Sequence, residues 1–109
     1  MATVYKVLGQ VAPSATTDTT LYTVPAATST VVSTITVANR SAVAVTYRIA
    51  IRPAGASIST THYIAFDASC PANDAILLTL GMTLAATDVM TVRASTADAT
   101  FNLFGSEIS

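Results

Sequence analysis

The residues of this sequence best suited to catalysis are a histidine, a cysteine and an aspartate that follow one another closely. Nucleophilic hydrolysis needs a nucleophile, a base and an orienting carboxylate that converge in space, and the chain has one histidine, His62, and one cysteine, Cys70. A site that His62 shares with Cys70 or Asp67 is left open by the sequence, but one His and one Cys fall short of the ligand set of a structural zinc ion. We expect His62 to be an exposed loop or edge residue and Cys70 to be a packed thiol.

The acidic residues and glycines do not form a pattern typical of a catalytic or nucleotide-binding site. Glycosidases need two carboxylates held at a set distance in a cleft, whereas the aspartates here fall at or near predicted strand ends, where they hydrogen-bond turn backbone. These aspartates are Asp18, Asp67, Asp74, Asp88 and Asp98. The glycines are too far apart to form a phosphate-binding loop. We therefore predict no catalytic, cofactor-binding or metal-binding residues, and no enzyme activity.

The aromatic residues are the candidates for contact with a partner. A carbohydrate-binding face usually shows a row of exposed rings, and the chain has no Trp. Phe104 lies on the strand face opposite Phe101 and Leu103, so it is either an outward contact residue or part of a second core layer. Four aromatic residues have strand positions that allow them to face outward, and we take these as the candidate interface residues: Tyr5, Tyr22, Tyr63 and Phe104.

The elements that position these residues are short runs rich in Val, Ile, Thr and Tyr, separated by Pro, Gly, Asn and Asp. The clearest run, residues 43–52, alternates apolar and polar side chains with the period of a strand. The run 30–38 precedes it, and a turn at residues 39–41 would join the two as a hairpin. The other predicted strands are residues 3–10, 20–24, 61–66, 75–80, 89–94 and 100–104.

About eight short strands without a helical stretch imply antiparallel pairing, because parallel pairs need long crossovers. The sequence predicts an all-β fold: one antiparallel β-sandwich domain over residues 1–109, with jelly-roll or immunoglobulin-like topology. Residues 82–86 are interpreted as a connection and residues 13–20 as a flexible loop. The predicted core consists of Val45, Tyr47, Ile49, Ile51, Ile64, Phe66, Ile76, Leu78, Leu80, Met90, Val92, Phe101 and Leu103.

The composition argues against charged partners. Charged residues make up 10% of the chain, against about 25% in typical soluble domains, so the surface is unusually neutral. The few basic residues are scattered, which predicts no nucleic-acid binding. No apolar run is long enough to span a bilayer, which predicts no membrane partner. A surface with so little like-charge repulsion favours self-association.

Several segments resemble small virion structural proteins of tailed bacteriophages, including cyanophages. They are Leu21–Ala26, Val31–Ile35, Asn39–Ser41, Tyr47–Ala50, His62–Ala65, Leu80–Ala85 and Phe104–Ile108. The resemblance spans nearly the whole chain and consists of strand-and-turn patterns. It implies a location in the virion and carries over no catalytic residue.

The resemblance implies, first, a head decoration or cement protein that binds the major capsid protein as a homodimer or homotrimer and stabilises the shell. A tail, neck, baseplate or fibre-associated component is the alternative within the virion. A third alternative, from a different class, is a module that binds host glycan through Tyr22, Tyr63 or His62.

Overall fold

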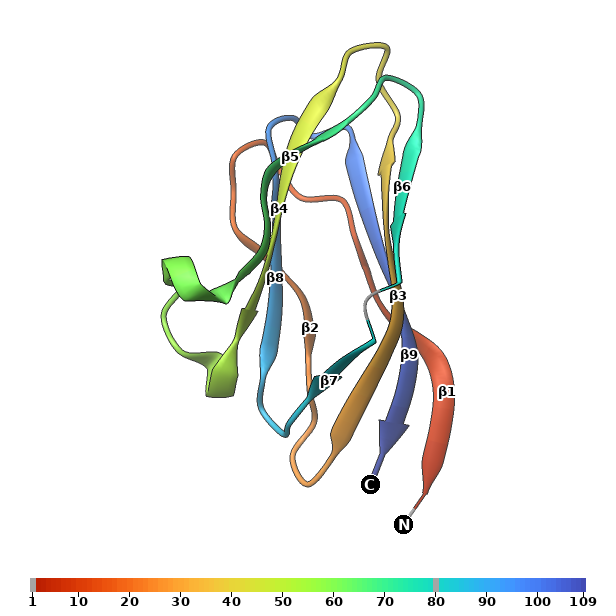
Figure 1. The fold of residues 1–109 in the computed structure, drawn as a ribbon, viewed down its shortest axis with the longest axis vertical. Helices are drawn as coiled ribbons and strands as arrows, with labels where there is room; N and C mark the ends of the chain where they lie inside the picture. The colour runs from red at the N-terminus through yellow and green to blue at the C-terminus, as the bar shows by residue number, and fades with distance from the viewer. Residues whose placement is uncertain (1, 80) are drawn as a thin grey trace.

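The computed structural model describes residues 2–79 and 81–109, and this part of the chain forms β-strands with two short 3-10 turns, Pro53–Gly55 and Thr60–His62 (Figure 1). Leu80, predicted to end a strand and to enter the core, lies outside the described residues. The strands are β1 (Thr3–Val11), β2 (Thr19–Thr23), β3 (Ser29–Asn39), β4 (Val45–Arg52), β5 (Tyr63–Cys70), β6 (Ala75–Leu78), β7 (Met82–Leu84), β8 (Val89–Ala94) and β9 (Ala99–Ile108).

The strands form two antiparallel sheets that pack face to face, which confirms the predicted all-β sandwich. Sheet A has the order β1-β9-β3-β6, and β7 pairs with β3 as well. Sheet B has the order β2-β8-β4-β5. Within the described residues, no helix is long and apolar enough to cross a membrane.

The strand pairing identifies the topology as a jelly roll rather than an immunoglobulin-like sandwich. β4 pairs with its successor β5, β3 with β6, β2 with β8, and β1 with β9. The chain is therefore a long antiparallel double ribbon, with the β4–β5 connection at its tip, wound so that alternate pairs lie in opposite sheets. β6 and β7 together occupy one strand position, because both pair with β3.

The predicted hairpin between residues 30–38 and 43–52 is wrong. β3 belongs to sheet A and β4 to sheet B, and the segment between them crosses from one sheet to the other. The buried Asn39 holds this crossover, because its Nδ2 donates to the carbonyls of Val43, Cys70 and Pro71. Its Oδ1 accepts from the backbone N–H of Ser41. The Asn39 side chain thus takes the place of backbone hydrogen-bond partners where the chain crosses between sheets. In the sequence, such an asparagine looks the same as one that forms a tight turn.

The core lies between the two sheets, and most of the residues predicted for it are buried there or pack against it. Ile51, Ile76 and Leu78 are partly buried against it. The predicted core residues that are buried are Val45, Tyr47, Ile49, Met90, Val92, Phe101 and Leu103.

Two predicted core residues, Ile64 and Phe66, are exposed. β5 contains a bulge, seen as a shift in its register with β4, and Asp67 within it has a positive φ of 52°. An extra residue in one strand changes which side chains face inward beyond it. Ala65 and Ala68 pack against the core in place of Ile64 and Phe66.

Two segments interpreted as connections contain strand residues. β7 lies within residues 82–86 and pairs with β3, so the interpretation of this segment as a connection is wrong for Met82–Leu84. β2 begins at Thr19, inside the predicted loop 13–20. Pro13 in that loop is fully buried, and the backbone N–H of Thr16 donates to the carbonyl of Ala94.

Candidate binding faces

The outward face of sheet A carries no charged side chain among the described residues. The strands of sheet A contain two charged residues, Lys6 and Glu107. Both occupy inward-facing positions of their strands, where Lys6 is the cross-strand partner of Gly105 and Glu107 is that of Val4. They form an ion pair of 3.1 Å at the end of the sandwich. The outward positions, set by the register with the buried Phe101 and Leu103, include Thr3, Tyr5, Val7, Gln10, Val31, Thr34, Thr36, Leu77, Asn102, Phe104 and Ser106.

A shallow apolar hollow on this face brings together two of the predicted interface residues. Tyr5 on β1, Phe104 on β9 and Val31 of β3 form the apolar wall of a hollow of about 420 Å³, and Lys6, which is paired with Glu107, also lines it. The side chain of Tyr5 is 83% exposed. Phe104 is half-buried on the outer face of sheet A. It is therefore an outward residue and not part of a second core layer. Leu77, 67% exposed on β6, adds an apolar side chain that the sequence analysis did not single out.

Tyr22 is buried, so the expectation that it faces outward is wrong. A register shift between Thr20 and Tyr22 marks a bulge in β2, and both Leu21 and Tyr22 enter the core. The Tyr22 hydroxyl donates to Glu107 at 2.5 Å and lies 2.8 Å from the hydroxyl of Thr30. Burial, together with the Glu107 hydrogen bond, raises the pKa of Tyr22 to about 12.

Removing the Tyr22 hydroxyl tests this buried contact through its pH dependence. The Tyr22 hydroxyl and then Lys6 hold the pKa of Glu107 below its usual 4.5, so the contact stabilises the fold above that pH and is lost as the pH falls through the lowered pKa. Tyr22→Phe is expected to lower the free energy of unfolding by about 1–2 kcal/mol near neutral pH. Urea unfolding at several pH values measures the difference, which should shrink in acid; a difference that does not change with pH contradicts the role of Glu107.

Tyr63 lies on the other sheet and contacts a second aromatic residue. Its ring packs edge-to-face on Phe66 with 4.8 Å between ring centres, and the guanidinium of Arg48 lies 4.1 Å from the centre of the Phe66 ring. Tyr63 is half-buried, whereas Phe66 is 55% exposed. The sequence analysis placed Phe66 in the core. The bulge in β5, which side-chain alternation does not reveal, places it on the surface instead.

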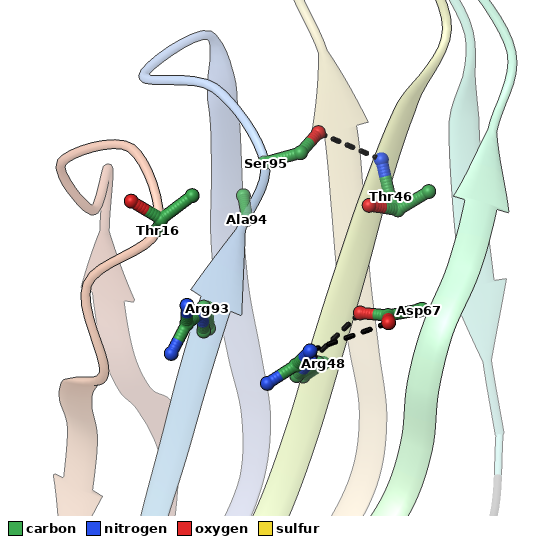
Figure 2. A pocket seen from close by; sticks show the side chains of 7 residues that line it. All are labelled: Thr16, Thr46, Arg48, Asp67, Arg93, Ala94 and Ser95. Carbon is green, nitrogen blue, oxygen red and sulfur yellow. Dashed lines mark hydrogen bonds and ion pairs between the residues drawn. The ribbon is translucent and has the colours of Figure 1, made fainter.

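The outer face of sheet B carries charged side chains beside the exposed Phe66, and Figure 2 shows Arg48, Asp67 and Arg93 around a hollow on this face. Arg48 on β4 and Arg93 on β8 are direct cross-strand neighbours. Asp67 accepts two hydrogen bonds from Arg48, and Asp18 lies 3.7 Å from Arg93, so an acid stands at each side of the arginine pair. The hydrogen bond from Arg48 lowers the pKa of Asp67. The two carboxylates and two guanidinium groups of this row neutralise one another, and Arg48, Asp67 and Arg93 among them line a hollow of about 220 Å³.

The structure gives His62, Cys70 and Asp67 separate partners. The Nδ1 atom of His62 accepts a hydrogen bond from the backbone N–H of Ser59 at 3.2 Å. Cys70 is buried, as expected, and burial raises the pKa of its thiol. Asp67 is engaged by Arg48. In residues 2–79 and 81–109, no three His, Cys, Asp or Glu side chains gather closely enough to hold a metal ion.

Comparison with known proteins adds no assignment to this geometry. Neither a protein-family model nor a curated protein matches the sequence. The contrast between the two sheet faces is therefore the main observation from which a function can be argued.

Proposed function

We propose that this chain is a non-enzymatic virion structural protein of the tailed-phage type, which decorates the outside of the head and docks onto assembled capsid protein through the outer face of sheet A. The observation that carries the proposal is the uncharged outer face of sheet A, with Tyr5, Phe104 and Leu77 exposed on it or lining its hollow. Apolar and aromatic surface of this kind is typical of protein contact sites.

The chemistry of this face favours a neutral protein partner. A partner rich in phosphate, such as nucleic acid or an anionic lipid surface, would have to lose water from its charges with only Lys6, which is already paired with Glu107, beside the hollow to replace it. Hydroxyl and amide side chains, such as Thr34, Thr36 and Asn102, can satisfy polar groups of a protein partner. The strands of sheet B carry Arg48, Arg52, Asp67 and Arg93, and these charged side chains keep the opposite face solvated.

The fold and the sequence patterns support a virion role together. Jelly rolls recur among viral capsid proteins and lectins, although a fold by itself does not decide a function. The resemblance to small phage virion proteins favours the first of these two uses. A decoration protein that binds only the assembled shell stabilises it by mass action, and repeated weak contacts suffice when many copies bind.

Mass spectrometry of purified particles is the direct test. We expect the polypeptide in mature virions at a copy number comparable with that of the major capsid protein. A few copies per particle would instead place the protein in the tail, neck or baseplate. Its absence from purified particles would contradict a virion role altogether.

Adding a charge to the docking face is expected to weaken binding to the head. Phe104→Asp should lower the affinity for heads stripped of this protein at least about thirtyfold, because the new carboxylate must be buried unpaired against the capsid. Thr46→Asp is the matched control, since it adds the same charge to the exposed face of sheet B. Co-sedimentation with stripped heads measures both variants, and thermal unfolding checks that each is folded.

A second substitution keeps this test decisive if Phe104→Asp destabilises the fold. Leu77→Asp places a carboxylate on the same face at a more exposed position. Equal binding by Leu77→Asp, Thr46→Asp and the unchanged protein would refute docking through sheet A.

Glycan binding is the second candidate function, and the exposed Phe66 ring on sheet B favours it. Aromatic rings with polar neighbours bind sugars by stacking and hydrogen bonding, and Phe66 adjoins Tyr63 and Arg48. Tyr22 is buried and is no longer a candidate for this contact. Glycan-array binding that is abolished by Phe66→Ala and Tyr63→Ala would support this function, whereas binding that survives both changes would remove the site.

A further inference from the structure

The edge strands of the two sheets differ in how well they are protected from pairing with another chain. β5 carries a bulge at Asp67, β2 is short and bulged, and β6 and β7 are short. Short length, bulges and charges are the devices by which proteins block edge pairing. β1 is the longest of the edge strands, and its register with β9 is regular from Thr3 to Val7. Figure 1 shows β1 at the outside of the sandwich, beside β9.

The regular part of β1 exposes apolar side chains on both of its faces. Val4 is 50% exposed on the inner side, while Tyr5 and Val7, 83% and 47% exposed, lie on the outer side. All five residues of this part, Thr3–Val7, are exposed. An exposed edge strand with apolar side chains is a site for strand addition.

The backbone groups of Thr3, Tyr5 and Val7 point toward the free edge. Ala2 and Ser109 exchange two backbone hydrogen bonds across β1 and β9. In an antiparallel pair, hydrogen-bonded and non-hydrogen-bonded residue pairs alternate, so Val4 and Lys6 bond to β9 and the residues between them face away from it. No strand of the described residues lies on that side of β1 to receive them.

We propose that β1 pairs with β1 of a second copy of this chain, antiparallel and across a twofold axis at Tyr5. In this register Tyr5 faces Tyr5 of the partner subunit, and Thr3 faces Val7 of the partner subunit. Each of these pairs joins residues whose backbone groups point toward the free edge, so both strands can exchange hydrogen bonds. The interface is isologous, which means that the same strand supplies both sides.

Charge favours a second copy in this register. Lys6 is the single charged residue of β1, and the Tyr5-centred register places it opposite Val4 of the partner subunit while it keeps its own ion pair with Glu107. A register centred on Lys6 would place two ammonium groups directly opposite each other, which destabilises a strand pair. In the Tyr5-centred register, no charged side chain of one β1 strand lies opposite a charged side chain of the other.

This pairing goes beyond the docking role and does not depend on it. It would join the two A sheets into one continuous sheet, with the uncharged outer faces of both copies side by side. The dimer therefore doubles the proposed docking face, and each copy raises the effective concentration of the other at the shell.

Opposite charges at the twofold axis provide a sharp test. Tyr5→Lys and Tyr5→Glu should each weaken the homodimer at least about tenfold, because like charges then face each other and the aromatic pair is lost. An equimolar mixture of the two variants should dimerise again, since the charges across the axis are then opposite. Sedimentation velocity over a concentration series measures all three samples, and the restored heterodimer shows that both variants remain folded.

Leu77→Lys is the control, because it adds a charge to the same sheet face at the distant β6 edge. It should leave the dimer unchanged while it weakens binding to stripped heads, so dimerisation and docking can fail separately. A monomer at every concentration, a trimer, or a Tyr5→Lys and Tyr5→Glu mixture that stays monomeric would overturn the proposal.

Discussion

Phe101→Ala is expected to lower the free energy of unfolding by about 3–5 kcal/mol, the usual cost of removing a buried phenyl ring. Phe101 is fully buried between the sheets, and its ring packs edge-to-face against Tyr47 with 6.4 Å between ring centres. It therefore joins sheet A to sheet B. The strands around the ring are held by their own hydrogen bonds, so we expect the cavity to close only in part.

Phe66→Ala is the matched control, because it removes the same ring from an exposed position. It should cost less than about 1 kcal/mol through the lost contacts with Arg48 and Tyr63. Chemical denaturation at constant temperature compares the two variants. Similar costs for both would mean that Phe101 does not occupy the centre of the core.

Gly105→Ala is expected to destabilise the protein by at least about 3 kcal/mol or to prevent folding, because the new methyl group would overlap the backbone of β3. A Cβ atom at Gly105 would lie 2.1 Å from the carbonyl oxygen of Val31 and 3.0 Å from the Cα atom of Val32. Both contacts are backbone, so no side chain can rotate to relieve them. The clash lies at the register shift between Val32 and Thr34, where β3 and β9 pair.

Gly81→Ala separates this clash from the general effect of adding a methyl group to a glycine. Gly81 has a positive φ of 62°, and a Cβ atom there would meet nothing within 4 Å. It should cost only about 1 kcal/mol, from the left-handed backbone alone. Thermal unfolding of both variants measures the difference; a Gly105→Ala protein as stable as Gly81→Ala would show that β3 and β9 do not approach so closely.

The two faces of the sandwich suggest a division of roles that the composition alone could not reveal. The chain has few charges, and most of its arginines, Arg48, Arg52 and Arg93, belong to the strands of sheet B. Sheet A keeps only the Lys6–Glu107 pair, at its end. A neutral protein could have spread its charges evenly; here the outward positions of one broad face bear no charged side chain, which is why we propose docking through that face.

Half of the candidate interface could be predicted from the sequence. Tyr5 and Phe104 lie on one outer face, as strand alternation allows, and line the same hollow. Tyr22 and Phe66 were assigned to the wrong side, because bulges in β2 and β5 shift the alternation where they occur. A bulge depends on how a strand meets its neighbour, and the neighbours of these strands come from distant parts of the chain.

The sequence by itself determined that the chain forms short strands and a two-sheet sandwich, because side-chain alternation is a local property that each strand carries alone. Tertiary structure decided the rest. The hydrogen bonds of Asn39 send β4 to the opposite sheet, and pairing between distant strands selects the jelly roll. The same pairing leaves β1 at an open edge and collects the uncharged side chains on one face, since both depend on which strands become neighbours.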